Sequence, residues 1–188
     1  MVNRSDKKPG DEELVKRVQG GESALFGELV ERYQQRVYTV VFGMVHHRED
    51  ALDLAQEIFV KAYNSLKYFR GDSSFYTWLY RVTVNVVIDF RRKGRGIKPL
   101  SYEDGLAGEI AGRMAPPDQQ VMTHELRQAL HRALASLPHE QQTVIILREV
   151  EGLSYQEIAD VVQCSIGTVM SRLHYARKRL QELLKPFL

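Results

Sequence analysis

Residues 154–184 read SYQEIADVVQCSIGTVMSRLHYARKRLQELL, and their pattern predicts two helices joined by a tight turn. Ser154 and Glu157 have the spacing of a capping box, which fixes where a short helix begins. Only three residues, 163–165, separate that helix from a longer one that Ser165 can cap. The stretch therefore predicts a helix-turn-helix.

The longer helix has two different sides. At about 100° per residue, its apolar residues share one side: Val169, Leu173, Ala176, Leu180 and Leu183. The opposite side and its flanks carry polar and basic residues: Ser171, Arg172, His174, Tyr175, Arg177, Lys178 and Arg179. A recognition helix has this arrangement, with early side chains reaching base edges and flanking cations meeting phosphates. An ordinary amphipathic helix is the alternative, but the capped first helix and the short turn favour DNA contact.

Helical periodicity runs through the rest of the chain as well. Apolar residues recur every third or fourth position in the ranges 25–41, 55–66, 75–90 and 126–147. We find no convincing run of the alternation that would indicate a strand. We therefore expect an all-α protein, with four helices before a linker and four after it.

The linker is predicted from glycine and proline, which concentrate between residues 94 and 118. Glycine costs backbone entropy and proline removes a hydrogen-bond donor, so this density interrupts regular structure. We divide the chain into an N-terminal lobe (1–95), a flexible linker (96–120) and a C-terminal lobe (121–188). The two lobes are mildly basic and the linker is acidic.

Composition narrows the class of protein. The chain has 188 residues and a net charge of +2, enough for one medium domain or two small ones. Its one cysteine, Cys164, excludes an intrachain disulfide and a cysteine-based zinc cluster. Neither a secretory signal nor a stretch of roughly 20 apolar residues is found, so we expect a soluble, cytoplasmic protein.

Residues 68–81 read YFRGDSSFYTWLYR and contain the chain's single tryptophan and five other aromatic residues. Gly71 permits a tight turn, and Ser73 or Ser74 can cap the next helix. On that helix one face is apolar, and a different face carries Trp78, Arg81, Asn85 and Arg92. Aromatic rings beside cations and an amide suit unstacked bases, because stacking is worth roughly 1–3 kcal/mol per base. The alternative is that the rings pack in the core, which we prefer for Phe75, Leu79 and Tyr80.

The preceding helix has an acidic face. Asp50, Asp53 and Glu57 lie opposite its apolar stripe. Carboxylates repel DNA, so this face is expected to look toward a protein or toward solvent.

Several of these segments resemble bacterial extracytoplasmic-function (ECF) sigma factors of the sigma-70 family, in particular their sigma-E-like branch. The likeness to region 2 lies in DLAQEIFVKAY (53–63), FRGDS (69–73) and FYTWLYR (75–81). The likeness to region 4 lies in LSYQEIA (153–159) and GTVMSRL (167–173). Together they cover nearly the whole chain outside residues 96–118.

The resemblance implies a promoter-specificity subunit of RNA polymerase that is not itself an enzyme. Region 2 would read and melt the −10 element, and Phe69, Arg70, Gly71, Asp72 and Ser73 would form a loop that receives a flipped base. Asn85 would lie beside that pocket, and Trp78, Arg81 and Arg92 would extend the surface. The polymerase clamp would contact the helix that carries Asp50, Asp53, Gln56 and Glu57.

Region 4 would read the −35 element. Ser171, Arg172, His174, Tyr175 and Lys178 would face the major groove, and Arg148, Gly167 and Thr168 would lie on the phosphate side. Met170 and Tyr175 depart from the family pattern, because basic residues are usual at the first position and arginine is common at the second. The implied partners are core RNA polymerase, through its clamp and flap, promoter DNA, and an anti-sigma factor that is often tethered to the membrane.

Two other functions stay open at the level of the residues. A helix-turn-helix regulator that binds an operator as a dimer would explain residues 154–184 but not the aromatic segment or the acidic face. An enzyme would draw on the six histidines, but no metal-binding motif such as HExxH is present, and we expect surface histidines. No metal or cofactor is therefore predicted.

Overall fold

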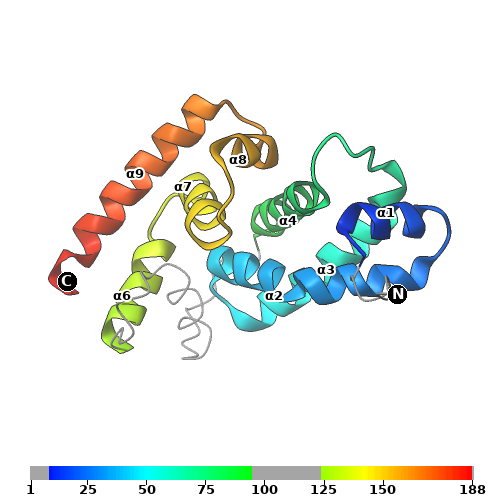
Figure 1. Cartoon of the computed structure of the whole chain (residues 1–188). Helices are drawn as coiled ribbons and strands as arrows, with labels where there is room; N and C mark the ends of the chain where they lie inside the picture. Colours follow the sequence, from blue (N-terminus) through cyan, green and yellow to red (C-terminus); the bar gives the residue numbers. More distant parts are fainter. Residues whose placement is uncertain (1–8, 95–123, 188) are drawn as a thin grey trace, which may run out of the picture.

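The computed structural model describes residues 9–94 and 124–187, so the predicted linker (96–120) lies outside the described residues. Within these ranges the chain forms eight α-helices and no strand, four helices on each side of the gap (Figure 1). The prediction of an all-α fold is confirmed. No helix in the described ranges has both the length and the apolar character needed to cross a membrane.

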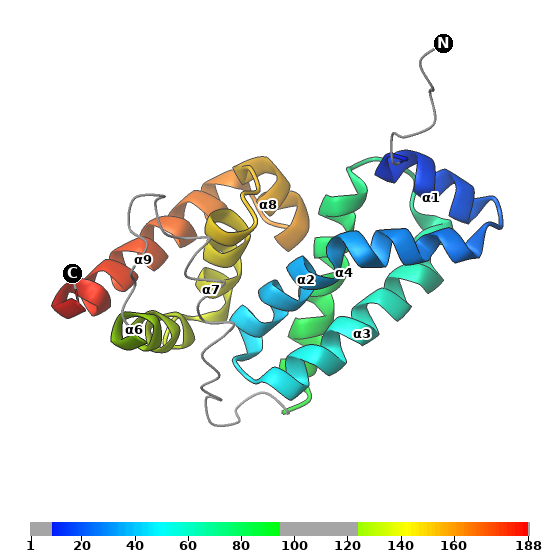
Figure 2. The same ribbon diagram turned by 60° about the horizontal axis from the view of Figure 1, so that its bottom comes forward.

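The N-terminal lobe is built on two long helices that lie side by side (Figure 2). Its helices are α1 (Asp11–Gln19), α2 (Phe26–Val45), α3 (Arg48–Ser65) and α4 (Phe75–Arg92). α2 ends where His46 adopts a left-handed conformation with φ 57°, and His47 then caps α3. This two-residue turn reverses the chain, so that α2 and α3 can pack along their length, and α4 packs against both.

The C-terminal lobe contains the predicted helix-turn-helix. Its helices are α6 (His124–Ala135), α7 (His139–Ile145), α8 (Tyr155–Val162) and α9 (Ile166–Leu184), and a π-helical turn (Ile146–Val150) extends α7. The capping box of α8 is complete: the Ser154 hydroxyl accepts from the Glu157 amide, and the Glu157 carboxylate accepts from the Ser154 amide. The Ser165 hydroxyl caps α9 by accepting from the Thr168 amide at 3.1 Å.

The two lobes pack directly against each other. α4 lies on α8, and the C-terminal half of α2 meets α6, α7 and the π-helical turn, so one hydrophobic core runs through both lobes. Gly43 on α2 permits the close approach, because a Cβ atom at this position would lie 3.0 Å from the Ile146 Cδ1. Periodicity along the sequence predicts each lobe separately and gives no sign of this contact.

A buried carboxylate lies at the centre of the contact between the lobes. The Glu151 side chain is fully buried, and its Oε2 accepts hydrogen bonds from Arg36 Nε at 2.8 Å and from the Tyr80 hydroxyl at 2.7 Å. The Tyr76 hydroxyl donates to the Glu151 carbonyl oxygen at 2.9 Å. Burial beside this carboxylate raises the pKa of Tyr80 far above its usual value, so the phenol remains a donor. A residue of the C-terminal lobe is thus held by three side chains of the N-terminal lobe.

Candidate nucleic-acid interface

The loop between the 3₁₀ turn (Leu66–Tyr68) and α4 is fixed at its base and open at its tip. Gln19 Nε2 donates to the carbonyl oxygens of Leu66 at 2.8 Å and Phe69 at 2.9 Å, which ties the loop to α1. At the far end the Ser74 hydroxyl accepts from the Thr77 amide and begins α4. Between them Arg70, Gly71 and Asp72 are exposed and Ser73 is half-buried, with Gly71 at φ 80°. The loop therefore presents a short, anchored stretch of backbone to solvent.

Aromatic side chains line the base of this loop. The ring of Phe69 lies 5.2 Å from that of Trp78, and Phe75 lies 5.7 Å from Trp78 on the inner side. Phe75 and Tyr80 are buried, as expected, whereas Phe69 and Trp78 are only partly covered. The Phe69–Trp78 pair can thus meet a planar ligand at its open edge.

The sequence interpretation missed Tyr68, which is the most exposed of the large apolar residues in the described ranges, at 73%. The Lys67 ammonium lies 4.9 Å from the centroid of its ring. An aromatic residue next to a lysine, directly before the loop, was the available signal.

The polar face of α4 is divided by the contact between the lobes. Asn85 and Arg92 are exposed, and Arg92 pairs with Asp89 at 3.0 Å. Arg81 does not lie on a free surface in this conformation, because its Nε donates to the Asp160 carbonyl oxygen of α8 at 3.1 Å. Helical spacing places Arg81 with Asn85 and Arg92, but α8 covers that part of α4.

The outward side of α9 is accessible. Ser171, His174, Tyr175 and Lys178 are exposed, as is Gly167 in the first turn, while Thr168 is half-buried. Met170 is 54% exposed and lines a shallow groove of about 660 Å³. The other groove residues are Tyr155, His174, Arg177, Lys178 and Gln181. The residues predicted to form the recognition face are therefore accessible on α9, and an exposed methionine lies among them.

Two arginines predicted for this face have internal partners. Arg148 Nη1 donates to the Leu153 carbonyl oxygen at 2.7 Å, and its guanidinium lies 5.1 Å from the Tyr155 ring centroid. Arg172 is half-buried, with Nη1 4.0 Å from the Cys164 Sγ in the turn. Both side chains brace the helix-turn-helix in this conformation.

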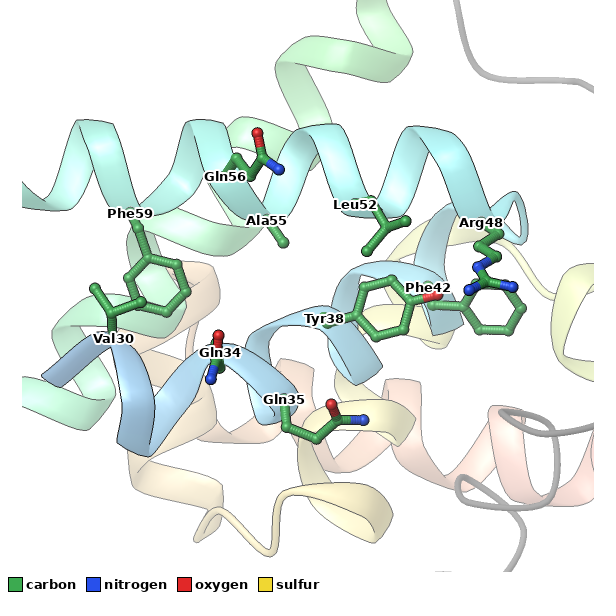
Figure 3. Close-up of a pocket in the computed structure, with 10 residues that line it drawn as sticks. All are labelled: Val30, Gln34, Gln35, Tyr38, Phe42, Arg48, Leu52, Ala55, Gln56 and Phe59. Atoms are coloured by element: carbon green, nitrogen blue, oxygen red, sulfur yellow. The ribbon is translucent and has the colours of Figure 1, made fainter. Parts of the chain in front are cut away.

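A groove of about 690 Å³ runs between α2 and α3 (Figure 3). Its walls are mainly apolar, and Leu52 on α3 is 44% exposed within it. The lining residues are Val30, Gln34, Gln35, Tyr38, Phe42, Arg48, Leu52, Ala55, Gln56 and Phe59. The sequence interpretation found only Gln56 of this set, because its apolar residues come from two helices.

The predicted acidic residues lie around this groove. Asp53 and Glu57 are exposed, each one position after a groove residue and so about 100° further round α3. Glu57 pairs with Lys61 at 2.8 Å. Asp50 is half-buried at the start of α3, where it pairs with His47 at 3.2 Å. The groove thus combines an apolar floor with an acidic margin.

The expectation that the histidines lie at the surface is wrong for two of them. His46 and His131 are only 8% and 6% exposed, because the packing of the lobes removes both from water. Burial, together with neighbouring His131 and Arg91, lowers the pKa of His46 to about 3, and burial also lowers the pKa of His131. Among the described residues, no group of three or more His, Cys, Asp or Glu is arranged to hold a metal ion.

Comparison with known proteins identifies both lobes. The family model for sigma-70 region 2 matches residues 29–97, and the model for sigma-70 region 4 matches residues 127–180. The RNA polymerase sigma-H factor of Pseudomonas aeruginosa is 40% identical over 185 residues, with 95% of both chains covered. The ECF RNA polymerase sigma-E factor of Escherichia coli K12 is 39% identical over 184 residues, which covers 95% of this chain and 96% of the relative.

Two solved structures are similar over most of their length. CnrH in complex with the cytosolic domain of CnrY has a TM-score of 0.69 and 25% identity, covering 92% of this chain and 96% of that one. The sigma factor RpoE of Bartonella quintana, in complex with the anti-sigma factor NepR, has a TM-score of 0.67 and 28% identity, covering 85% and 96%. The chain therefore belongs to the ECF group of the sigma-70 family of RNA polymerase sigma factors.

Proposed function

We propose that the chain directs core RNA polymerase to promoters through three surfaces. The N-terminal lobe (1–95) reads the −10 element, the C-terminal lobe (121–188) reads the −35 element, and the groove between α2 and α3 binds the polymerase. The observation that carries this proposal is their presence on one chain: an anchored loop with aromatic residues, an exposed recognition face and an apolar groove.

At the −10 element, the loop from Phe69 to Ser73 receives a base that has left the stack. Removing a base costs a few kcal/mol, which a fitted pocket offsets for the correct base and not for a wrong one. The partly covered rings of Phe69 and Trp78, and the exposed amide of Asn85, supply stacking and hydrogen bonding. The contacts that hold the unstacked base in the loop therefore both select the −10 sequence and keep the DNA strands apart.

At the −35 element, the first turns of α9 enter the major groove. Ser171, His174 and Tyr175 have hydroxyl and imidazole groups for base edges and phosphates. Met170 is apolar and exposed in the same region, which suits contact with the methyl group of thymine.

The groove between α2 and α3 binds the polymerase clamp. An apolar floor with carboxylates at its margin fits an amphipathic helix that carries basic residues beside its apolar face. We propose that an anti-sigma factor tethered to the membrane controls the chain by occluding these surfaces. The solved structures of CnrH with the cytosolic domain of CnrY and of the sigma factor RpoE with the anti-sigma factor NepR support this partner class.

Engaging both promoter elements requires the lobes to separate. The −10 and −35 elements lie about 25 base pairs apart, which is about 85 Å along B-form DNA at 3.4 Å per pair. We call the structure in which the two lobes pack together the closed form. In it α4, which follows the −10 loop, is packed directly on α8 of the helix-turn-helix. Once polymerase holds the lobes apart, the second DNA contact forms at high effective concentration.

We further propose that the chain catalyses no reaction, needs no cofactor and acts in the cytoplasm, because RNA synthesis belongs to the polymerase. The rival function is an operator-binding dimer. It would use α8 and α9 but leaves the −10 loop and the groove without a role.

Transcription in vitro tests the proposal. Core polymerase mixed with this chain is expected to produce transcripts from defined start sites, mapped across the genome of the host. Core polymerase alone and the chain alone should give none. A mixture that stays inactive while the chain alone binds an operator tightly would replace the proposal with the regulator.

Asn85→Ala is expected to lower promoter opening about tenfold, because one hydrogen bond to an unpaired base is worth about 1.5 kcal/mol. Asn85 is exposed, so the fold and the affinity for core polymerase should not change. Permanganate reactivity of unpaired thymines measures opening, and fluorescence anisotropy measures core binding. Asn64→Ala, an exposed asparagine on α3, serves as the matched control. Equal loss of opening and core binding would remove Asn85 from the −10 surface.

A further inference from the structure

A hydrogen-bonded group of four side chains joins the lobes, and we call it the interlobe histidine cluster. His46 at the end of α2 and Arg91 on α4 come from the N-terminal lobe. His131 on α6 and Gln142 on α7 come from the C-terminal lobe. His46, His131 and Gln142 are buried, and Arg91 is half-buried.

The orientation of the Gln142 amide is fixed from two sides. Its Oε1 accepts from Arg91 Nη2 at 2.8 Å, and its Nε2 donates to the Leu134 carbonyl oxygen at 3.0 Å. Arg91 can only donate and a carbonyl oxygen can only accept, so the amide cannot turn over without losing both bonds. Its second N–H therefore points at His46 Nε2, 2.5 Å away.

This orientation decides where each imidazole proton sits. His46 Nε2 must accept from Gln142, so its proton is on Nδ1, which faces His131 Nε2 at 3.4 Å. His131 Nε2 must then accept, and its own proton is on Nδ1. A second proton on either ring would set two N–H groups against each other, because both facing nitrogens already accept. The cluster is therefore complete only when both rings are neutral.

Among the described residues, the charged groups around the cluster are either positive themselves or already paired. Arg91 on α4 is positively charged, and the Glu140 carboxylate on α7 interacts electrostatically with this arginine. The nearby carboxylate of Asp50 pairs with His47 at the start of α3, and Glu140 pairs with His139. Phe42 on α2 stacks against the His131 ring with centroids 5.4 Å apart.

We propose that the interlobe histidine cluster is a proton-sensitive latch, which holds the lobes together while both rings are neutral and releases them when the pH falls. In the open form both rings return to water, where histidine takes up a proton near pH 6.5. The lowered pKa values in the closed form mean that it binds fewer protons than the open form. The latch is therefore at full strength above about pH 6.5 and weakens as the pH falls toward the pKa of about 3 for His46.

The expected size follows from this linkage. Between pH 7.5 and pH 5.5, each histidine that must stay neutral lowers the ratio of closed to open chain about tenfold, and two lower it up to about a hundredfold. The proposal concerns the contact between the lobes and does not depend on the proposed function.

Energy transfer between two dyes on the full-length chain measures this ratio. In a Cys164→Ser background, Val60→Cys on α3 and Gln181→Cys on α9 provide exposed labelling positions in the two lobes. A urea titration at each pH yields the opening constant even where the closed form dominates, and circular dichroism reports helix content in parallel. The opening constant is expected to rise at least tenfold from pH 7.5 to 5.5. An unchanged constant would overturn the proposal.

Variants assign the effect to the cluster. His46→Asn removes the titrating ring and keeps a residue that tolerates the left-handed conformation at φ 57°, so the pH dependence should fall by about tenfold. His139→Gln replaces an exposed histidine on α7, the helix that carries Gln142. This variant should keep the full pH dependence of the opening constant. A dependence that survives in His46→Asn and disappears in His139→Gln would overturn the assignment.

Imidazole NMR signals of the unlabelled natural chain give a second readout that needs no variant. In the closed form the ring protons of His46 and His131 are expected to keep neutral shifts at pH values where a histidine in water, with a pKa of about 6.5, becomes protonated. Titration of both rings near pH 6.5 without opening would show that the buried rings accept protons freely, which contradicts the proposal.

Discussion

Glu151→Gln is expected to raise the fraction of open chain roughly thirtyfold at neutral pH. The substitution keeps the size of the side chain, and the amide oxygen can still accept from Arg36 and Tyr80, but the charge that Arg36 neutralises is lost. Breaking a buried ion pair costs about 3–5 kcal/mol. Arg36 is 36% exposed and can regain water, so we expect a cost of about 2 kcal/mol.

The dye pair described above measures this change, with differential scanning calorimetry as a check on the fold. Glu149→Gln is the matched control, because Glu149 lies two positions away and pairs with Arg177 at 2.6 Å near the surface. An exposed pair is worth about 0–1 kcal/mol, so the control should change the opening constant less than about fivefold. Equal effects of the two substitutions would show that the buried carboxylate does not hold the lobes together.

Leu52→Asp is expected to weaken binding to core polymerase about a hundredfold or more. Leu52 lines the groove between α2 and α3 and is 44% exposed, so an aspartate can stay hydrated in the free chain and the fold should survive. When a partner covers the groove, that carboxylate loses its water against apolar side chains, and Arg48 one turn earlier offsets only part of this cost. The cost of burying such a group in an interface is about 3 kcal/mol.

Fluorescence anisotropy of the labelled chain with core polymerase measures the dissociation constant. Ile88→Asp supplies the control, because Ile88 on α4 is an apolar residue of similar exposure, at 40%, and does not line the groove. Binding that is weakened equally by both substitutions, or by neither, would leave the groove without its proposed partner.

Local signals in the sequence predicted the helices and their ends. Apolar periodicity acts over three or four positions, and the caps at Ser154 and Ser165 depend on side chains that reach only the next turn. The helix-turn-helix and the division into four helices on either side of the gap were therefore available without any tertiary information.

Contacts between the lobes could not be predicted in the same way. His46 and His131 are 85 positions apart, and each alone has the polarity of a surface residue. Glu151 differs from its half-buried neighbour Glu149 because Arg36 and Tyr80 meet it from the other lobe. The partner groove was missed for a related reason, since α2 and α3 each supply half of an apolar surface that neither helix reveals alone.

Phe42 belongs to the groove that we assign to polymerase (Figure 3), and its ring also packs against His131. Occupancy of one site can thus change the free energy of the other, and such coupling is reciprocal by thermodynamic necessity. If the groove ligand prefers separated lobes, protonation of the two rings will raise the affinity of the groove for its ligand. The bound ligand will raise the proton affinity of the rings by the same factor. The pH and the binding of polymerase would then both act on the same equilibrium between packed and separated lobes.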